Sequence, residues 1–170
     1  MAKDKKTRYQ ELREECGYTR EKVCELMGGF SHSKLVRIES GDQKPHPKDV
    51  YDLSRIYKTP SLCNYYCSHE CDIGEKYVPE IRVKDLSQIV LEMLASLNTT
   101  EKKRERLIEI CSDGVISKDE IRDFIDIQES LEKISITVET LQIWCERMRE
   151  RGVIDKVAYE YELEQRKKRS

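Results

Sequence analysis

A chain of 170 residues is long enough for one domain, or for one small domain with an extension. Charged residues make up 38% of it and aromatic residues only 7%, so we expect a modest core beneath a well-hydrated surface. The formal net charge of -2 excludes a strongly basic chain, and no apolar run approaches the roughly 20 residues that span a bilayer.

The distribution of charge is more informative than its sum. Residues 1–60 carry 13 Lys and Arg against 10 Asp and Glu, a net +3, whereas the remainder carries 18 against 23, a net -5. The charged start of the chain lacks the hydrophobic segment of a signal peptide. Seven cysteines, an odd number, favour free thiols in a reducing compartment. We therefore expect a soluble, cytoplasmic protein without membrane association.

Helical spacing of apolar residues predicts a first helix over residues 8–16 and a second from Arg20 to about Met27, which Thr19 caps. The second helix should bury Val23, Cys24 and either Leu26 or Met27. A turn at Gly28-Gly29 follows.

Ser31 should cap a third helix that ends at Gly41. Its Leu35 and Ile38 should point inward, while the polar residues on its other side stay exposed: His32, Ser33, Lys34 and Arg37.

A fourth helix from Lys48 to Tyr57 should bury Val50, Leu53 and Ile56, and a fifth should cover residues 61–71. Five short helices within residues 1–74 predict a compact all-α domain. Residues 75–84 are expected to form a connector, because Pro79 is incompatible with a regular helix through them.

Residues 85–170 should form a second helical region. A first amphipathic helix should carry the apolar stripe that runs from Leu86 to Leu97, and a separate helix should follow Thr99-Thr100. Ser117 and Glu120 form a capping-box pattern that opens the longest helix, residues 118–150. The polar tail, residues 160–170, is expected to fray.

The longest helix carries a heptad repeat. One apolar row comprises Phe124, Leu131, Val138 and Cys145, and the other comprises Ile127, Ile134, Leu141 and Met148. Four heptads are typical of a coiled coil, but further isoleucines outside the seam widen the apolar face and favour a helical hairpin or bundle. We expect this helix to mediate dimerisation.

Residues 8–60 resemble the Cro/cI-type, or XRE-type, helix-turn-helix regulators. The resemblance rests on residues 12–19, 21–27 and 31–39, on Gly41 and on Lys44-Pro45, and the Arg37-Ile-Glu39-x-Gly41 ending is its most specific part. Two departures are the turn Gly28-Gly29-Phe30, one residue longer than the family pattern, and Asp42, where the family commonly has a basic residue.

The resemblance implies an operator-binding regulator that binds double-stranded DNA, usually as a dimer. It places base-reading residues at the start of the third helix. It places phosphate contacts at the start of the second helix and in the loop after the third. In this sequence the implied DNA-binding residues are Arg20, Ser31, His32, Ser33, Lys34, Arg37 and Lys44. Such side chains can pair with base edges or phosphates, and the alternative is an ordinary solvated helix face.

Cysteines recur every four residues in Cys63, Cys67 and Cys71, with His69 between the last two. Thiols and imidazole suit zinc or an iron–sulfur cluster, but eight helical residues extend about 12 Å, which is too far for one ion unless the helix breaks. The alternative is a cysteine-rich packing surface, because a free Cys behaves as a small hydrophobe. We expect no cofactor, with zinc or an iron–sulfur cluster at these residues as the alternative.

The sequence therefore predicts an all-α protein with a five-helix, Cro/cI-like DNA-binding domain, a connector and a C-terminal helical hairpin or bundle. Its predicted function is sequence-specific transcription regulation and not catalysis, since no glycine-rich phosphate loop, His-x-x-x-His pair or nucleophile elbow is present. Two alternatives stay open: a protein-interaction or antitoxin-like module, and a regulator gated by metal or thiol chemistry.

Overall fold

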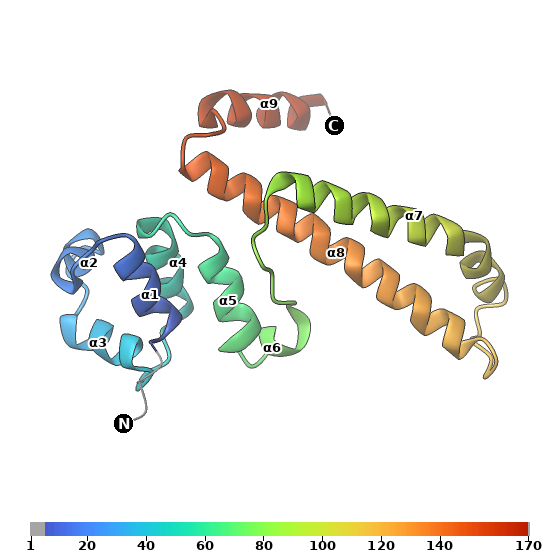
Figure 1. The fold of residues 1–170 in the computed structure, drawn as a ribbon, viewed down its shortest axis with the longest axis horizontal. Helices are drawn as coiled ribbons and strands as arrows, with labels where there is room; N and C mark the ends of the chain where they lie inside the picture. Colours follow the sequence, from blue (N-terminus) through green and yellow to red (C-terminus); the bar gives the residue numbers. More distant parts are fainter. Residues whose placement is uncertain (1–5, 170) are drawn as a thin grey trace. The chain divides into compact units, whose positions relative to one another are not determined.

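The described part of the computed structural model, residues 6–169, contains nine helices and no strand (Figure 1). The predicted all-α class is confirmed. Close contacts divide the chain into two compact units, one made of the residues up to Glu80 together with those from Arg147 onward, and the other of Ile81–Glu146.

The first unit begins with five short helices: α1 Arg8–Glu15, α2 Arg20–Leu26, α3 His32–Ser40, α4 Pro47–Ile56 and α5 Ser61–His69. Side-chain caps fix where several of them start. Thr7 accepts a hydrogen bond from the amide of Gln10, and Thr19 accepts one from Lys22. At α4, His46 and Asp49 form a reciprocal capping box around Pro47.

One apolar core joins these helices. It consists of nine buried residues: Tyr9, Leu12, Val23, Leu35, Ile38, Val50, Leu53, Tyr57 and Leu62. Of the predicted pair Leu26 and Met27, Met27 packs against the core and Leu26 is exposed. Cys24 and Ile56, both predicted to be buried, are half-buried at the edge of the core.

The predicted fifth helix and connector need correction. The helix ends at His69, and a further short helix, α6 Gly74–Tyr77, occupies the start of the segment predicted as connector. The absence of a side chain on Gly74 permits this arrangement, since a Cβ there would lie 2.1 Å from the carbonyl oxygen of Cys67. Val78 is extended just before Pro79, so the proline does exclude helix from the rest of the segment.

The second unit contains α7 Leu86–Ile110 and most of α8 Ile121–Glu150, which lie antiparallel (Figure 1). The predicted break at Thr99-Thr100 is wrong, because α7 runs through both residues. Their hydroxyls donate to the carbonyl oxygens of Ala95 and Ser96, one turn earlier, which lets them fit inside a helix.

At the start of α8, the Glu120 carboxylate accepts hydrogen bonds from the amide and the hydroxyl of Ser117. The helix itself begins at Ile121, three residues later than predicted.

The C-terminal segment is more ordered than predicted. Helix α9 spans Lys156–Arg169, and Asp155 caps it by accepting from the amide of Ala158. Four basic residues in its last turn suit the negative end of the helix dipole, which favours a helix in this polar sequence. None of the helices in the described range combines the length and apolar character needed to cross a bilayer.

Two buried tyrosines of the core provide a matched test of its polar groups. Tyr9 and Tyr57 are 2% and 3% exposed. The hydroxyl of Tyr9 donates to the Glu70 carboxylate at 2.9 Å, whereas that of Tyr57 has no hydrogen-bond partner within the described residues. Burial, followed by the charge of Glu70, raises the pKa of Tyr9 above its ordinary value.

We predict that Tyr9→Phe lowers the free energy of unfolding by about 1.5–3 kcal/mol, because it removes a hydrogen bond to a charged group. Tyr57→Phe should leave that free energy unchanged or raise it, since no hydrogen bond is lost. Urea unfolding of both variants measures the difference. An equal loss in the two variants would contradict the assigned hydrogen bonding.

Candidate nucleic-acid interface

Helices α2 and α3 form the core of the predicted DNA-reading motif, and a glycine turn sets their geometry. Gly28 and Gly29 have φ values of 68° and 93°, in the left-handed region that other residues rarely adopt. Gly41 ends α3 with a φ of 84°. Ser31 occupies the N-cap position as predicted, but its hydroxyl contacts Ser33 at 3.0 Å and makes no capping hydrogen bond.

Helix α3 has one buried and one open side. Leu35 and Ile38 are 0% and 1% exposed in the core, as predicted. His32, Ser33 and Arg37 are exposed, and the guanidinium of Arg37 has no ion-pair or hydrogen-bond partner among the residues described. The fold therefore presents three of the predicted base-reading residues together on the solvent side of one helix.

Lys34 differs from the prediction because it is not freely exposed. Its ammonium group lies 2.7 Å from the Asp49 carboxylate of α4 and 4.8 Å from the centre of the Phe30 ring. Phe30 belongs to the longer turn that distinguishes this chain. The charge of Lys34 is thus already balanced within the protein, and sequence spacing alone gave no sign of this pairing.

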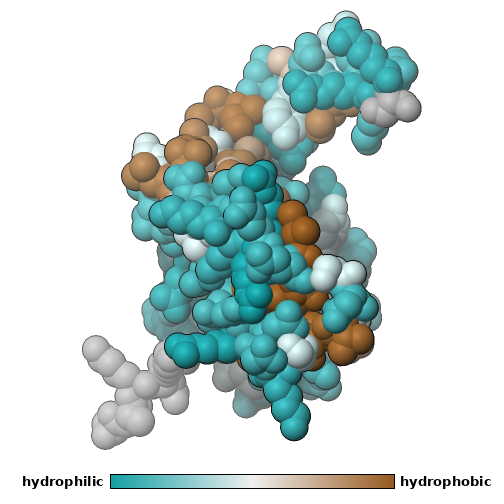
Figure 2. Space-filling model, turned by 90° about the vertical axis from the view of Figure 1, so that its right-hand side faces the viewer, coloured by the Kyte–Doolittle hydropathy of each residue, from teal (hydrophilic) through white to brown (hydrophobic). Residues whose placement is uncertain are grey.

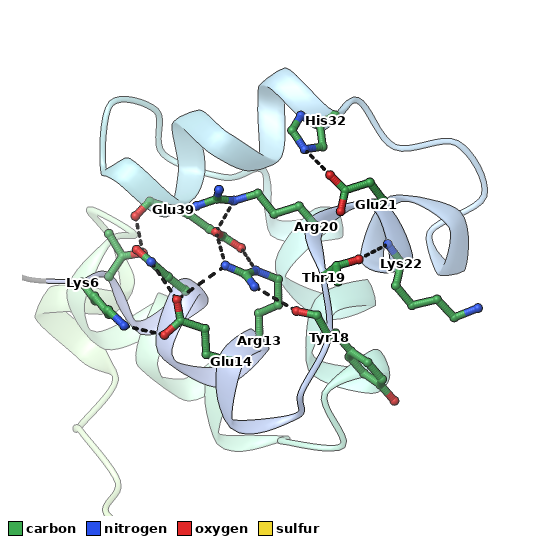
Figure 3. A network of polar contacts seen from close by, with 12 residues as sticks. Lys6, Arg13, Glu14, Tyr18, Thr19, Arg20, Glu21, Lys22, His32 and Glu39 are labelled. Carbon is green, nitrogen blue, oxygen red and sulfur yellow. Dashed lines mark hydrogen bonds and ion pairs between the residues drawn. The ribbon is translucent and has the colours of Figure 1, made fainter.

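The start of α3 is also tied to the start of α2. His32 Nε2 lies 3.2 Å from a carboxylate oxygen of Glu21, and both side chains are more than half exposed (Figure 3). This contact is an ion pair only when the imidazole is protonated. It is exposed enough for a ligand to replace it.

Glu39 connects three helices from the inner side of the motif (Figure 3). Its side chain is fully buried and accepts from Arg13 of α1 at 2.6 and 3.0 Å and from Arg20 of α2 at 2.8 Å. Arg13 also donates to the carbonyl oxygen of Tyr18 at 2.9 Å. The hydrogen bond with Glu39 raises the pKa of Arg13. We name Glu39, Arg13 and Arg20 the Glu39 network.

Sequence reasoning did not identify the Glu39 network. The one available signal was the Arg-Ile-Glu ending of α3, whose glutamate falls one residue after the buried Ile38. A carboxylate in that position must find cationic partners, because an unpaired buried charge is strongly destabilising.

Comparison with known proteins agrees with this geometry. Residues 8–62 match the family model described as a helix-turn-helix domain. This part of the chain is a helix-turn-helix domain. The predicted helix-turn-helix is confirmed for that segment. The search of curated proteins found no match, and the search of solved structures found none either.

Two further cations of the helix-turn-helix domain lie at its predicted phosphate-contacting positions. Arg20, at the start of α2, uses Nε for Glu39 and keeps 35% of its side chain exposed. Lys44, in the loop after α3, donates to the carbonyl oxygen of Glu70 at 3.0 Å and lies 3.7 Å from Asp72. Exposed contacts such as those of Lys44 with Glu70 and Asp72 are weak, so Lys44 can exchange them for contacts with a phosphate.

The predicted cysteine cluster and His69 are spread over α5 and the segment that follows it. Cys71 lies beyond the end of α5, and the ring of His69 stacks on Tyr65 at 4.7 Å. Burial raises the pKa of the Cys67 thiol. Within residues 6–169, no group of three or more His, Cys, Asp or Glu side chains is placed to hold an ion.

We predict that Glu39→Gln lowers the free energy of unfolding by about 3–5 kcal/mol, because Arg13 and Arg20 lose their shared carboxylate and Arg13 is nearly buried. Urea unfolding followed by circular dichroism measures this loss. The matched control is Glu21→Gln, which removes an exposed carboxylate and should leave the unfolding midpoint unchanged. Equal midpoints for the two variants would show that the Glu39 network does not support the fold.

Proposed function

We propose that this protein is a sequence-specific DNA-binding transcriptional regulator that reads an operator with α3 in the major groove and acts as a dimer. The observation that carries the proposal is the exposed side of α3, where Arg37 stands without a partner among the described residues while Leu35 and Ile38 anchor the opposite side. A helix held in this way can enter the groove as a rigid element.

Each exposed residue of α3 has a chemistry suited to its place. The planar guanidinium of Arg37 can donate two parallel hydrogen bonds to the O6 and N7 atoms of guanine. Ser33 and His32 lie at the start of the helix and can donate to bases or phosphates. Arg20 and Lys44 would contact the sugar-phosphate backbone and fix the register of the domain on the duplex.

Lys34 takes a different role in this proposal. Since Asp49 already balances its charge, moving Lys34 to a base or phosphate requires breaking a 2.7 Å ion pair. Its contribution to affinity should therefore be smaller than that of Arg37. The Asp49 and Phe30 contacts make Lys34 a residue that positions the turn and α3 against α4.

The dimer follows from the geometry of operators. A regulator of this type binds two half-sites about one helical turn apart, which requires two copies of α3 in a fixed relation. We propose no catalytic activity. The alternative of a protein-interaction module is favoured by one observation, the exposed apolar residues of α7 and α8.

We predict that Arg37→Ala weakens binding to genomic DNA fragments enriched by the wild-type protein by about 10- to 100-fold, because a bidentate contact to guanine is lost. Lys34→Ala should weaken it less. Arg122→Ala, at an exposed residue of α8 outside the helix-turn-helix motif, removes the same charge and should leave affinity unchanged. Gel shifts at fixed salt measure all three. Wild-type affinity in Arg37→Ala would reject α3 as the reading helix.

Phosphate contacts predict a separate signature in salt titrations. Lys44→Ala should weaken binding to every DNA sequence by a similar factor and reduce the slope of log affinity against log salt by about 1. Fluorescence anisotropy with an enriched and a scrambled duplex measures both quantities. If the slope of Lys44→Ala equals that of the wild type, Lys44 does not contact a phosphate.

A further inference from the structure

The hairpin of α7 and α8 buries few apolar side chains for its length. Of its large hydrophobic residues, only Ile89, Ile110 and Ile127 are buried among those described. Three buried residues of α8 are instead Ser130, Thr137 and Thr140, whose hydroxyls donate to carbonyl oxygens of their own helix at 2.6–2.8 Å. Helical hairpins of this length ordinarily depend on apolar packing, so this one lacks much of its expected stabilisation.

The heptad of α8 is divided between the inside and the outside of the hairpin. Ile127 is 3% exposed, and Ile134 and Leu141 of the same row are half-buried. Leu131 and Val138 of the other row are 46% and 40% exposed. A two-stranded coiled coil needs both rows to face its partner helix, whereas here one row already packs within the chain. In the second row only Leu131 and Val138 are open to another molecule, because Phe124 and Cys145 are half-buried.

Helix α7 adds a second exposed row. Leu86, Val90, Leu94 and Leu97 recur at helical spacing and are 40–52% exposed. Figure 2 shows groups of apolar residues reaching the surface among hydrophilic ones.

Polar contacts fix the register of the hairpin, because Lys103 donates to Ser130 and Arg106 to Asp123. Because the helices are antiparallel, moving nine residues back along α7 from Lys103 corresponds to moving a similar distance forward along α8 from Ser130. This places Leu94 beside Val138. At about 100° per residue, the two rows lie on the same side of the hairpin. We call these six residues the outer apolar face: Leu86, Val90, Leu94, Leu97, Leu131 and Val138.

We propose that the outer apolar face binds the same face of a second copy of the chain, so that two hairpins form a four-helix bundle. This inference rests on the proposed function, for which it supplies the dimer interface. In this proposal the two copies pair through whole hairpins of α7 and α8, whereas the sequence predicted pairing through the longest helix.

The charges around the outer apolar face fit a second copy. Near a two-fold axis each residue approaches its own counterpart, so like charges there would repel. The residues beside Leu131 and Val138 on α8 are uncharged and exposed, namely Gln128, Ser135 and Gln142. Beyond Leu97, Glu101 and Arg104 neutralise each other at 3.0 Å.

The size of the face also fits an interface between copies. Six large side chains that are about half exposed make an apolar patch of roughly several hundred Å², the size of the largest patch on a typical monomer, which is often functional. Two such patches with their polar rims reach the range of about 1,000 Å² or more that specific interfaces bury.

Sedimentation equilibrium of the full chain without DNA tests the proposal. The wild type should sediment as a dimer, and Leu131→Glu should weaken dimerisation at least 100-fold, because each interface would bury two carboxylates. Ile125→Glu is the matched control, since Ile125 is 48% exposed on α8 but lies on the other side of the helix. It should leave the dimer unchanged. Circular dichroism confirms that both variants keep the wild-type helix content.

Three results would overturn the inference: a monomeric wild type, a dimer that Leu131→Glu leaves intact, or equal dissociation by both variants. The gel shifts with Arg37→Ala are independent of this outcome. A monomer that still needs Arg37 for binding DNA would refute the second copy as partner and leave DNA reading in place. A dimer that does not bind DNA would support the second copy as partner and refute the proposed DNA reading.

Discussion

The buried carboxylate of Glu39 is the interaction on which the rest of the helix-turn-helix domain depends. It belongs to α3 and accepts hydrogen bonds from Arg13 of α1 and Arg20 of α2, so one side chain joins three helices. Its backbone carbonyl oxygen also accepts from Thr7, the cap of α1. Apolar packing of Leu35 and Ile38 holds α3 against the core but is not directional. The charged hydrogen bonds add direction, and they fix which side of α3 faces outward.

This arrangement separates the cations of the domain by function. Arg13 is almost fully buried and serves the fold, while Arg20 shares Glu39 and still reaches solvent. Lys34 is balanced by Asp49, and Arg37 alone on α3 keeps an unpaired guanidinium among the described residues. A modest basic surplus of +3 in the first 60 residues is therefore enough for the proposed function, because its placement matters more than its size.

Much of the fold could be predicted from sequence because its signals are local. Apolar spacing, Thr19 as a cap and Gly41 as a stop each act within a few residues, and the structure confirms them. The errors arose where a specific contact overrides the usual meaning of a residue type. Gly74 permits α6 because its lack of a side chain lets the carbonyl of Cys67 approach, and Thr99 and Thr100 stay helical by bonding to the preceding turn.

The candidate site shows the same limit of sequence reasoning. The exposed positions of α3 follow from helical spacing, and the structure places His32, Ser33 and Arg37 on one side as predicted. The pairing of Lys34 with Asp49 and that of Arg13 with Glu39 link residues 15 and 26 positions apart, so no local pattern revealed them. Which heptad row of α8 packs inward likewise depends on its register against α7.

The account makes one central claim, that the exposed side of α3 meets DNA while the Glu39 network holds its other side in place. Amide NMR spectra of the labelled protein, recorded with and without an enriched duplex, test this most directly. The account predicts that the largest shifts fall on residues 31–37 and on Arg20 and Lys44, with little change at the buried Arg13. Shifts confined to α7 to α9, with α3 unaffected, would contradict it.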